Sequence, residues 1–302
     1  MLRIGISVTS SYTVADPREG AASMIARAKA AREADLDTLF VGDHHVTPFP
    51  YYQNNVILAR MLAEWGDKPF GALYLLPLWH PVTLAEQVGT LASLAPGRFI
   101  MQCGLGDERQ GAAMGIDMSK KVGMFLASLR TLRSLWTGEP ANEDRYWHIK
   151  DAVISPRPVE PVEVWVGAVV DKAIERTAKV GDAWLASPGL TPADAAIVLR
   201  RYLEYCDQQG RQPETRAIRR DIYVGESTEE AKRTAALYIE KGYRGISPDA
   251  LMFGSVEEVA AQMKELGDAG FTDIIVRNMS KDPAQCLATI ERLREVKALL
   301  AG

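Results

Sequence analysis

The sequence predicts an α/β protein whose fold is a (β/α)8 TIM barrel with loop insertions. Short apolar runs rich in strand formers alternate with longer segments in which apolar residues recur every three or four positions, the pattern of successive βα units. Eight such runs occur within 302 residues, which suits a closed barrel better than an open sheet. We therefore expect one domain over residues 1–302.

The eight predicted strands are nearly continuous in apolar residues in several cases. Strands of a parallel sheet have this character because helices cover one face and packed side chains cover the other. The predicted strands span residues 2–7, 38–42, 71–76, 98–104, 162–167, 183–187, 218–224 and 273–277.

The predicted helices lie between these strands, and two of them have recognisable starts. Pro81 suits the first position of a helix that ends at Leu94. Ser255 and Glu258 have the S-x-x-E form of a capping box before a helix that ends at Ala269. The other predicted helices span residues 21–34, 122–136, 170–180, 192–209, 228–239 and 283–300.

Two segments exceed what a minimal barrel needs and are predicted to be insertions. Residues 138–161 are polar and rich in proline, and residues 241–254 are similarly loop-like. Such loops can close over the mouth of a barrel, and a plain surface excursion is an equally open interpretation.

Composition and charge narrow the class of partner. Acidic and basic residues are interspersed at a formal net charge of −4, so the sequence offers no basic stripe for nucleic acid. It has no apolar run of 18 residues for a membrane span and no signal-peptide pattern at its start, which makes the cytoplasm the expected location. Cys103, Cys206 and Cys286 lie far apart and suggest neither a disulfide framework nor a zinc site. We therefore expect a small-molecule partner.

Four stretches resemble the luciferase-like superfamily in their order and spacing. They are FVGDHH at 40–45, LLPLWHPVTLAEQVGTLASLAPGRF at 75–99, GLGDERQGAAMGI at 104–116 and SPRPVEPVEVWVGAVVDKAIERTAKVGDAWLA at 155–186. That superfamily includes bacterial luciferase-type flavin monooxygenases and oxidoreductases that use the deazaflavin coenzyme F420. The resemblance implies redox chemistry on a small organic substrate, either oxygen insertion with FMN or hydride transfer with F420, and the sequence leaves both cofactors open.

The segment after the second predicted strand contains the first candidate catalytic residue. A histidine beside a redox ring can donate a hydrogen bond, stabilise a developing anion or move a proton at neutral pH. The resemblance implies a histidine beside the reactive face of the flavin, and His44 matches it best. His45 should point elsewhere because side chains alternate along extended backbone. Asp43 should orient a histidine or contact the cofactor, whereas a metal site is disfavoured because adjacent extended residues do not converge.

Asp107, after the fourth strand, is the second catalytic candidate. A sheltered carboxyl group with a raised pKa could act as an acid, and an aspartate that caps the following helix is an equally open interpretation. The run GxGDxxxxxxxGI resembles the methylene-tetrahydromethanopterin reductase pattern of the deazaflavin branch. Gly104 and Gly106 should let the backbone approach the cofactor closely.

The ends of the fifth and sixth strands are the predicted phosphate site. Gly167 and Ala168 precede a helix whose exposed N–H groups could hold a phosphate, and the resemblance adds Ala186 and Ser187 nearby. Arg277, at the end of the last strand, could serve the phosphate or an anionic substrate, and a solvated arginine is the alternative.

The resemblance also implies a non-prolyl cis peptide behind the central flavin ring, which the motif order places near Leu73 and Tyr74. It leaves open a homodimer and a flavin reductase as electron donor. Two other functions were weighed: a non-catalytic flavin-binding subunit, and a metal-dependent barrel hydrolase, which the missing ligand cluster disfavours.

Overall fold

The computed structural model describes residues 2–8 and 15–302, and Met1, the first residue of the predicted domain, lies outside that part. Eight parallel strands of the described chain form a closed barrel, because β8 pairs with β9 and completes the circle. The predicted TIM barrel is therefore confirmed. The strands, in their order around the barrel, are β9 (Arg216–Val224), β11 (Asp273–Asn278), β1 (Arg3–Val8), β2 (Thr38–Val41), β3 (Phe70–Leu75), β4 (Phe99–Gly104), β7 (Glu163–Gly167) and β8 (Ala183–Ala186).

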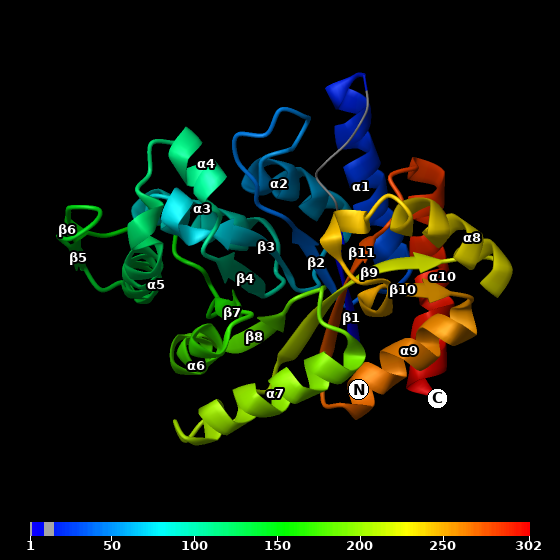
Figure 1. The fold of residues 1–302 in the computed structure, drawn as a ribbon. Helices are drawn as coiled ribbons and strands as arrows, with labels where there is room; N and C mark the ends of the chain where they lie inside the picture. The colour runs from blue at the N-terminus through cyan, green and yellow to red at the C-terminus, as the bar shows by residue number, and fades with distance from the viewer. Residues whose placement is uncertain (1, 9–14) are drawn as a thin grey trace.

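Helices surround the strands on the outside of the barrel (Figure 1). They are α1 (Pro17–Glu33), α2 (Asn54–Trp65), α3 (Pro81–Leu94), α4 (Glu108–Ala113), α5 (Lys121–Thr137), α6 (Asp171–Val180), α7 (Pro192–Asp207), α8 (Thr228–Ile239), α9 (Val256–Asp268) and α10 (Pro283–Ala301). The capping box of Ser255 and Glu258 is present at the start of α9, as predicted. None of the helices in the described residues combines the length and the apolar character that a bilayer span requires.

Two helices, α2 and α4, are absent from the sequence-based prediction. Gln53 precedes α2 and makes no side-chain capping bond, so this helix lacks the usual start signal. The helix α4 has only six residues, too few to show a helical repeat of apolar positions.

One layer of apolar side chains fills the barrel and supports its mouth. The layer consists of Phe40, Ile100, Trp165, Ala183, Leu185, Ala217 and Ile275, which come from strands alone. Two residues further along four of these strands stand Gly42, Gln102, Arg219 and Arg277. Because side chains alternate along a strand, these positions also face inward. The interior therefore changes from apolar to polar toward the carboxyl ends of the strands.

Both predicted insertions contain regular structure. The first holds an antiparallel hairpin of β5 (Ala141–Glu143) and β6 (Ile149–Ala152), which projects beyond α5 in Figure 1. The second holds two short 3-10 turns, η3 (Tyr243–Gly245) and η4 (Pro248–Ala250), and then β10 (Met252–Gly254), which pairs with β9.

Candidate functional site

A cleft of about 640 Å³ opens at the carboxyl ends of the strands. Its lining comes from β1, β3, β9 and β11, and from the segments that follow β2, β11 and α8. Phe49, Tyr51 and Leu73 provide an aromatic and apolar wall. TIM-barrel enzymes build their active sites at this end of the barrel, so the cleft is the candidate site.

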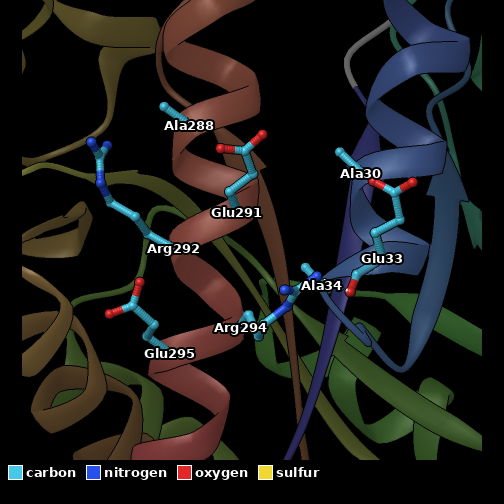
Figure 2. Close-up of a pocket in the computed structure, with 8 residues that line it drawn as sticks. All are labelled: Ala30, Glu33, Ala34, Ala288, Glu291, Arg292, Arg294 and Glu295. Carbon is cyan, nitrogen blue, oxygen red and sulfur yellow. Dashed lines mark hydrogen bonds between the residues drawn. The ribbon is translucent and has the colours of Figure 1, made fainter.

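Another hollow, of about 520 Å³, lies on the outer wall between α1 and α10 (Figure 2). Its lining residues are Ala30, Glu33, Ala34, Ala288, Glu291, Arg292, Arg294 and Glu295. They are small or oppositely charged side chains of two packed helices, and none stands at a strand end. We therefore place the candidate site in the cleft at the mouth.

His44 lines the cleft, and its ring centroid lies 5.5 Å from that of Tyr51. Its Nε2 atom is 3.1 Å from Nη2 of Arg109. Because a guanidinium group can only donate, Nε2 must accept this bond and the neutral ring carries its proton on Nδ1. Burial lowers the pKa of His44, and the charge of Arg109 lowers it further. His44 is thus a neutral hydrogen-bond donor at pH 7.

Asp43 links the ends of two strands beneath the cleft. Its buried Oδ2 atom accepts hydrogen bonds from the backbone N–H of Leu75 and from Nε1 of Trp79, both at 2.8 Å. Its Oδ1 atom is 3.1 Å from Nε2 of His45, whose ring packs against Trp79. His44 and His45 therefore point in different directions, as expected. Asp43 lies beside His45, but Nε2 of His45 makes no hydrogen bond among the described residues, so the orienting role of Asp43 stays a prediction. Contact of Asp43 with a cofactor stays a prediction.

Asp107 caps the start of α4. Capping was the alternative to an acid role in the sequence-based prediction. Its Oδ1 atom accepts from the backbone N–H of Gln110 at 2.9 Å, and its Oδ2 atom accepts from Nε2 of the same residue. Burial raises the pKa of Asp107, but these hydrogen bonds and the charge of Arg109 outweigh burial, and the pKa lies below its usual range. The lowered pKa and the capping bonds favour the capping interpretation over the acid role, and Asp107 does not line the cleft; its catalytic role stays a prediction.

Gln110 and Arg109 join the loops after β2 and β4, and neither was predicted. The buried amide of Gln110 accepts from the backbone N–H of His45 at 2.7 Å while its Nε2 atom donates to Asp107. Arg109 donates to the carbonyl of Val46 at 2.8 Å as well as to His44. Their positions depend on α4, which sequence patterning did not reveal.

Leu73 and Tyr74 point to opposite sides of β3. Leu73 lines the cleft, and its carbonyl accepts from Nδ2 of Asn54 at 2.9 Å. Tyr74 is buried, and its hydroxyl donates to Oδ1 of Asn55 at 2.6 Å, so it belongs to the core beside α2. The implied cis peptide is absent here: the cis bond among the described residues is Ser155–Pro156. The strand simply continues in extended form through this point.

Gly104 and Gly106, at the end of β4 and just after it, do not line the cleft. Gly106 has φ +72°, a left-handed conformation that strongly favours glycine, so the turn itself requires this residue. Gly104 is the last residue of β4. Their approach to a cofactor stays a prediction.

The predicted phosphate residues stand further around the barrel, at the ends of β7 and β8. Gly167 ends β7, Ala168 accepts from Nε1 of Trp184 at 3.0 Å, and Ala186 ends β8 just before Ser187. No side chain caps the start of α6, so the N–H groups of its first residues have no side-chain acceptor. They fit an anion, although none of these residues lines the cleft.

Charged side chains of β9 and β11 line the opposite side of the cleft. Arg219 and Arg277 come from these strands, and the buried carboxylate of Asp221 lies close to them. Of these three residues, Arg277 was predicted from the sequence, and Arg219 and Asp221 were not. The stretch IRRDIYV could have indicated both residues. Arg219 and Asp221 are two positions apart in a predicted barrel strand, so their side chains lie on the same face.

The sequence also matches a known protein family. The sequence model described as luciferase-like monooxygenase matches residues 2–299. The chain belongs to the luciferase-like monooxygenase family. The predicted resemblance is thereby confirmed over nearly the whole chain.

Three proteins that this chain resembles have the names of redox enzymes. An F420-dependent glucose-6-phosphate dehydrogenase of Beutenbergia cavernae is 28% identical over 200 residues, which cover 63% of this chain and 57% of the dehydrogenase. The fold matches monooxygenase RslO1 from Streptomyces bottropensis with a TM-score of 0.85 at 16% identity over 100% of both chains. It also matches an F420-dependent secondary alcohol dehydrogenase in complex with an F420-acetone adduct with a TM-score of 0.82 at 15% identity over 99% of both chains.

Proposed function

We propose that this luciferase-like protein is an oxidoreductase that uses coenzyme F420 to move a hydride to or from a small organic substrate. The position of His44, a neutral donor facing a cleft at the barrel mouth, carries the proposal. Similarity to an F420-dependent dehydrogenase supports the choice of cofactor.

The residues present fit a flavin-type group. A cleft of about 640 Å³ is within the usual size of small-molecule sites, and its Phe49 and Tyr51 offer apolar surface to a flat ring. Inside the mouth, the buried Nε2 of Gln102 has no hydrogen-bond partner among the described residues. The uncapped start of α6 suits a phosphate. When bound, the deazaflavin would supply hydride transfer, and FMN would supply electron transfer to oxygen.

His44 would act on charge that develops during the reaction. Nε2 of His44 accepts a hydrogen bond from Arg109, so the His44 ring can donate only the proton on Nδ1 to a substrate oxygen. A preorganised donor stabilises negative charge as it develops on that oxygen, because the donor needs no reorientation during the step. Asp43 and Gln110 would fix the backbone on either side of His44, since each bonds a neighbouring residue or loop.

The second candidate is an FMN-dependent monooxygenase, which the geometry of Asp107 favours. A carboxylate held as a helix cap with a lowered pKa is what we expect where that residue serves no acid role. A non-catalytic flavin-binding subunit was the other alternative, and the relatives named above are enzymes.

Family membership also supports three proposals about the setting of the enzyme. We propose a homodimer in the cytoplasm and, for the FMN form, a flavin reductase as electron donor. Light scattering of the purified protein tests the dimer, and activity with and without an added reductase tests the donor.

Titration with F420 and, separately, with FMN tests the proposed function. We expect one cofactor to bind at micromolar to low-millimolar concentration and to change its absorbance, because the cleft would remove water from one face of its ring. Calorimetry provides an independent readout. If neither spectrum changes and no heat is released, the redox function is refuted.

Replacing Asp107 with asparagine tests the acid role of this residue, and the oxygen dependence of the remaining turnover separates the two cofactor branches. Asparagine retains capping ability, so we expect turnover within about tenfold of the wild type, whereas loss of a catalytic acid costs about 100-fold or more. Asp117→Asn, which alters the cap of another short helical turn, is the matched control. A large rate loss at Asp107 with activity that persists without oxygen would instead restore the acid role in a deazaflavin enzyme.

A further inference from the structure

The cleft has a basic half, formed by cationic side chains from three parts of the chain. Arg219 of β9 and Arg277 of β11 stand at inward-facing positions above the apolar layer. Lys241 and Arg244 come from the segment after α8, and Lys281 follows β11. We call these five residues the basic half of the cleft.

The segment after α8 is fastened to the barrel by a buried carboxylate. Oδ2 of Asp221 accepts a hydrogen bond from the hydroxyl of Tyr243 at 3.0 Å and another from Nη1 of Arg244. Asp221 thus compensates the charge of Arg244 and holds Lys241 and Tyr243 at the edge of the cleft.

Little other negative charge is available to the basic half. Asp43 is the carboxylate that lines the cleft within the described part of the chain, and its Oδ2 atom already accepts from the backbone N–H of Leu75 and from Nε1 of Trp79. Arg219, Lys241 and Lys281 form no ion pair with any carboxylate in residues 2–8 and 15–302. The cleft therefore carries an excess of positive charge.

The closeness of the Arg219 and Arg277 charges is energetically unfavourable when no anion is bound. Burial, and then the charge of Arg277, lower the pKa of the Arg219 guanidinium to about 10, so two like charges repel each other inside the mouth. The Nε atom of Arg219 is buried and has no hydrogen-bond partner among the described residues. An oxyanion would supply both the missing charge and the missing acceptor, through strong charge-assisted hydrogen bonds.

We infer that the basic half of the cleft binds an oxyanion group of the substrate, with Arg219 and Arg277 contacting its oxygens and Lys241 covering it. The inference rests on the proposed function for the identity of the cleft as a substrate site. A doubly charged group such as phosphate matches the charge excess best, because a single carboxylate would leave more than one cation unmatched.

The distance between Arg277 in the basic half and His44 on the other side of the cleft sets the size of such a substrate. Only β1 lies between β2, which precedes His44, and β11, which holds Arg277. Neighbouring strands are about 4.8 Å apart, so these side chains start about 10 Å from each other. A substrate of sugar size with an acidic group at one end would reach from Arg277 to His44.

Calorimetric titration of the full chain with inorganic phosphate, at constant ionic strength, tests the inference. Loss of one charge-assisted contact should raise the phosphate Kd at least about tenfold in Arg219→Gln. Lys241→Gln should give a smaller increase, and since Lys241 is exposed, this variant tests the site even if Arg219→Gln fails to fold. Arg200→Gln, on the exposed face of α7, is the control and should leave the Kd unchanged.

Two results would overturn the inference. One is a phosphate affinity that is absent, or equal in the wild type and all three variants. The other is competition between phosphate and the cofactor that binds, which would assign the basic half to an acidic group of the cofactor. An unchanged phosphate Kd in the presence of saturating cofactor supports the substrate assignment. Phosphate binding that depends on Arg219 in a chain that binds neither cofactor would refute the proposed redox function alone.

Discussion

Replacing His44 with alanine should lower kcat by about 100-fold to 1,000-fold, the loss typical of removing one preorganised donor to a developing anion. The fold and most of the cofactor affinity should remain, because His44 is half-buried at the cleft and belongs to no core cluster. Steady-state turnover with the bound cofactor and a substrate found by screening provides the measurement. A ¹⁵N chemical shift for a protonated Nδ1 in the wild type would establish the donor directly.

The pH dependence of the wild type should report the same residue. Burial and Arg109 lower the pKa of His44 below its ordinary value of 6.5, so the neutral donor persists below that pH. Protonation puts a hydrogen on Nε2, which can then no longer accept from Arg109, so the ring loses its position and the acid limb of kcat should have a midpoint below 6.5. In Arg109→Gln one of the lowering charges is gone, and the midpoint should move upward. Asp107, Asp43 and His45 also act on the pKa of His44, and they are unchanged in this variant.

The lowered pKa of His44 also makes the stability of the fold depend on pH. As the pH falls through 6.5, the unfolded chain protonates His44 before the folded chain does, so this site lowers the stability of the fold in acid.

His148→Ala, on the β5–β6 hairpin, is the matched histidine control for His44→Ala and should leave turnover unchanged. Full activity in His44→Ala together with a large loss in His45→Ala would assign the reactive position to the other histidine.

Replacing Asp43 with alanine should lower the free energy of unfolding by about 3 kcal/mol, because two buried donors lose a charged acceptor. The donors are the backbone N–H of Leu75 and Nε1 of Trp79. Asp43→Asn keeps one acceptor oxygen and should lose about half as much. Urea unfolding followed by tryptophan fluorescence measures the change.

Asp144→Ala, an exposed aspartate on the hairpin, is the control for the stability measurement and should change it little. If Asp43→Ala unfolds at the wild-type urea concentration, the buried carboxylate does not hold the ends of β2 and β3 together. Its place beneath the cleft would then be explained by contact with a ligand alone.

The sequence by itself determined the barrel and the end of it that holds the site. Alternating apolar runs and helical repeats are local patterns, so all eight strands and the helix that starts at Ser255 could be predicted from neighbouring residues. The closed parallel barrel then placed His44 and the residues after β4 and β7 at one end, because parallel strands share their carboxyl ends. Alternation along extended backbone also separated His44 from His45.

Only the tertiary structure decided how these residues are held there and which groups they contact. Asp107 could be an acid or a cap on sequence grounds, and the choice depends on Gln110 and on the charge of Arg109, whose positions follow from α4. Tyr74 belongs to the core because α2, which has no sequence start signal, lies behind it. The basic half joins β9, the segment after α8 and β11, which are distant in sequence, and burial and like charge act between them through space once the barrel has closed.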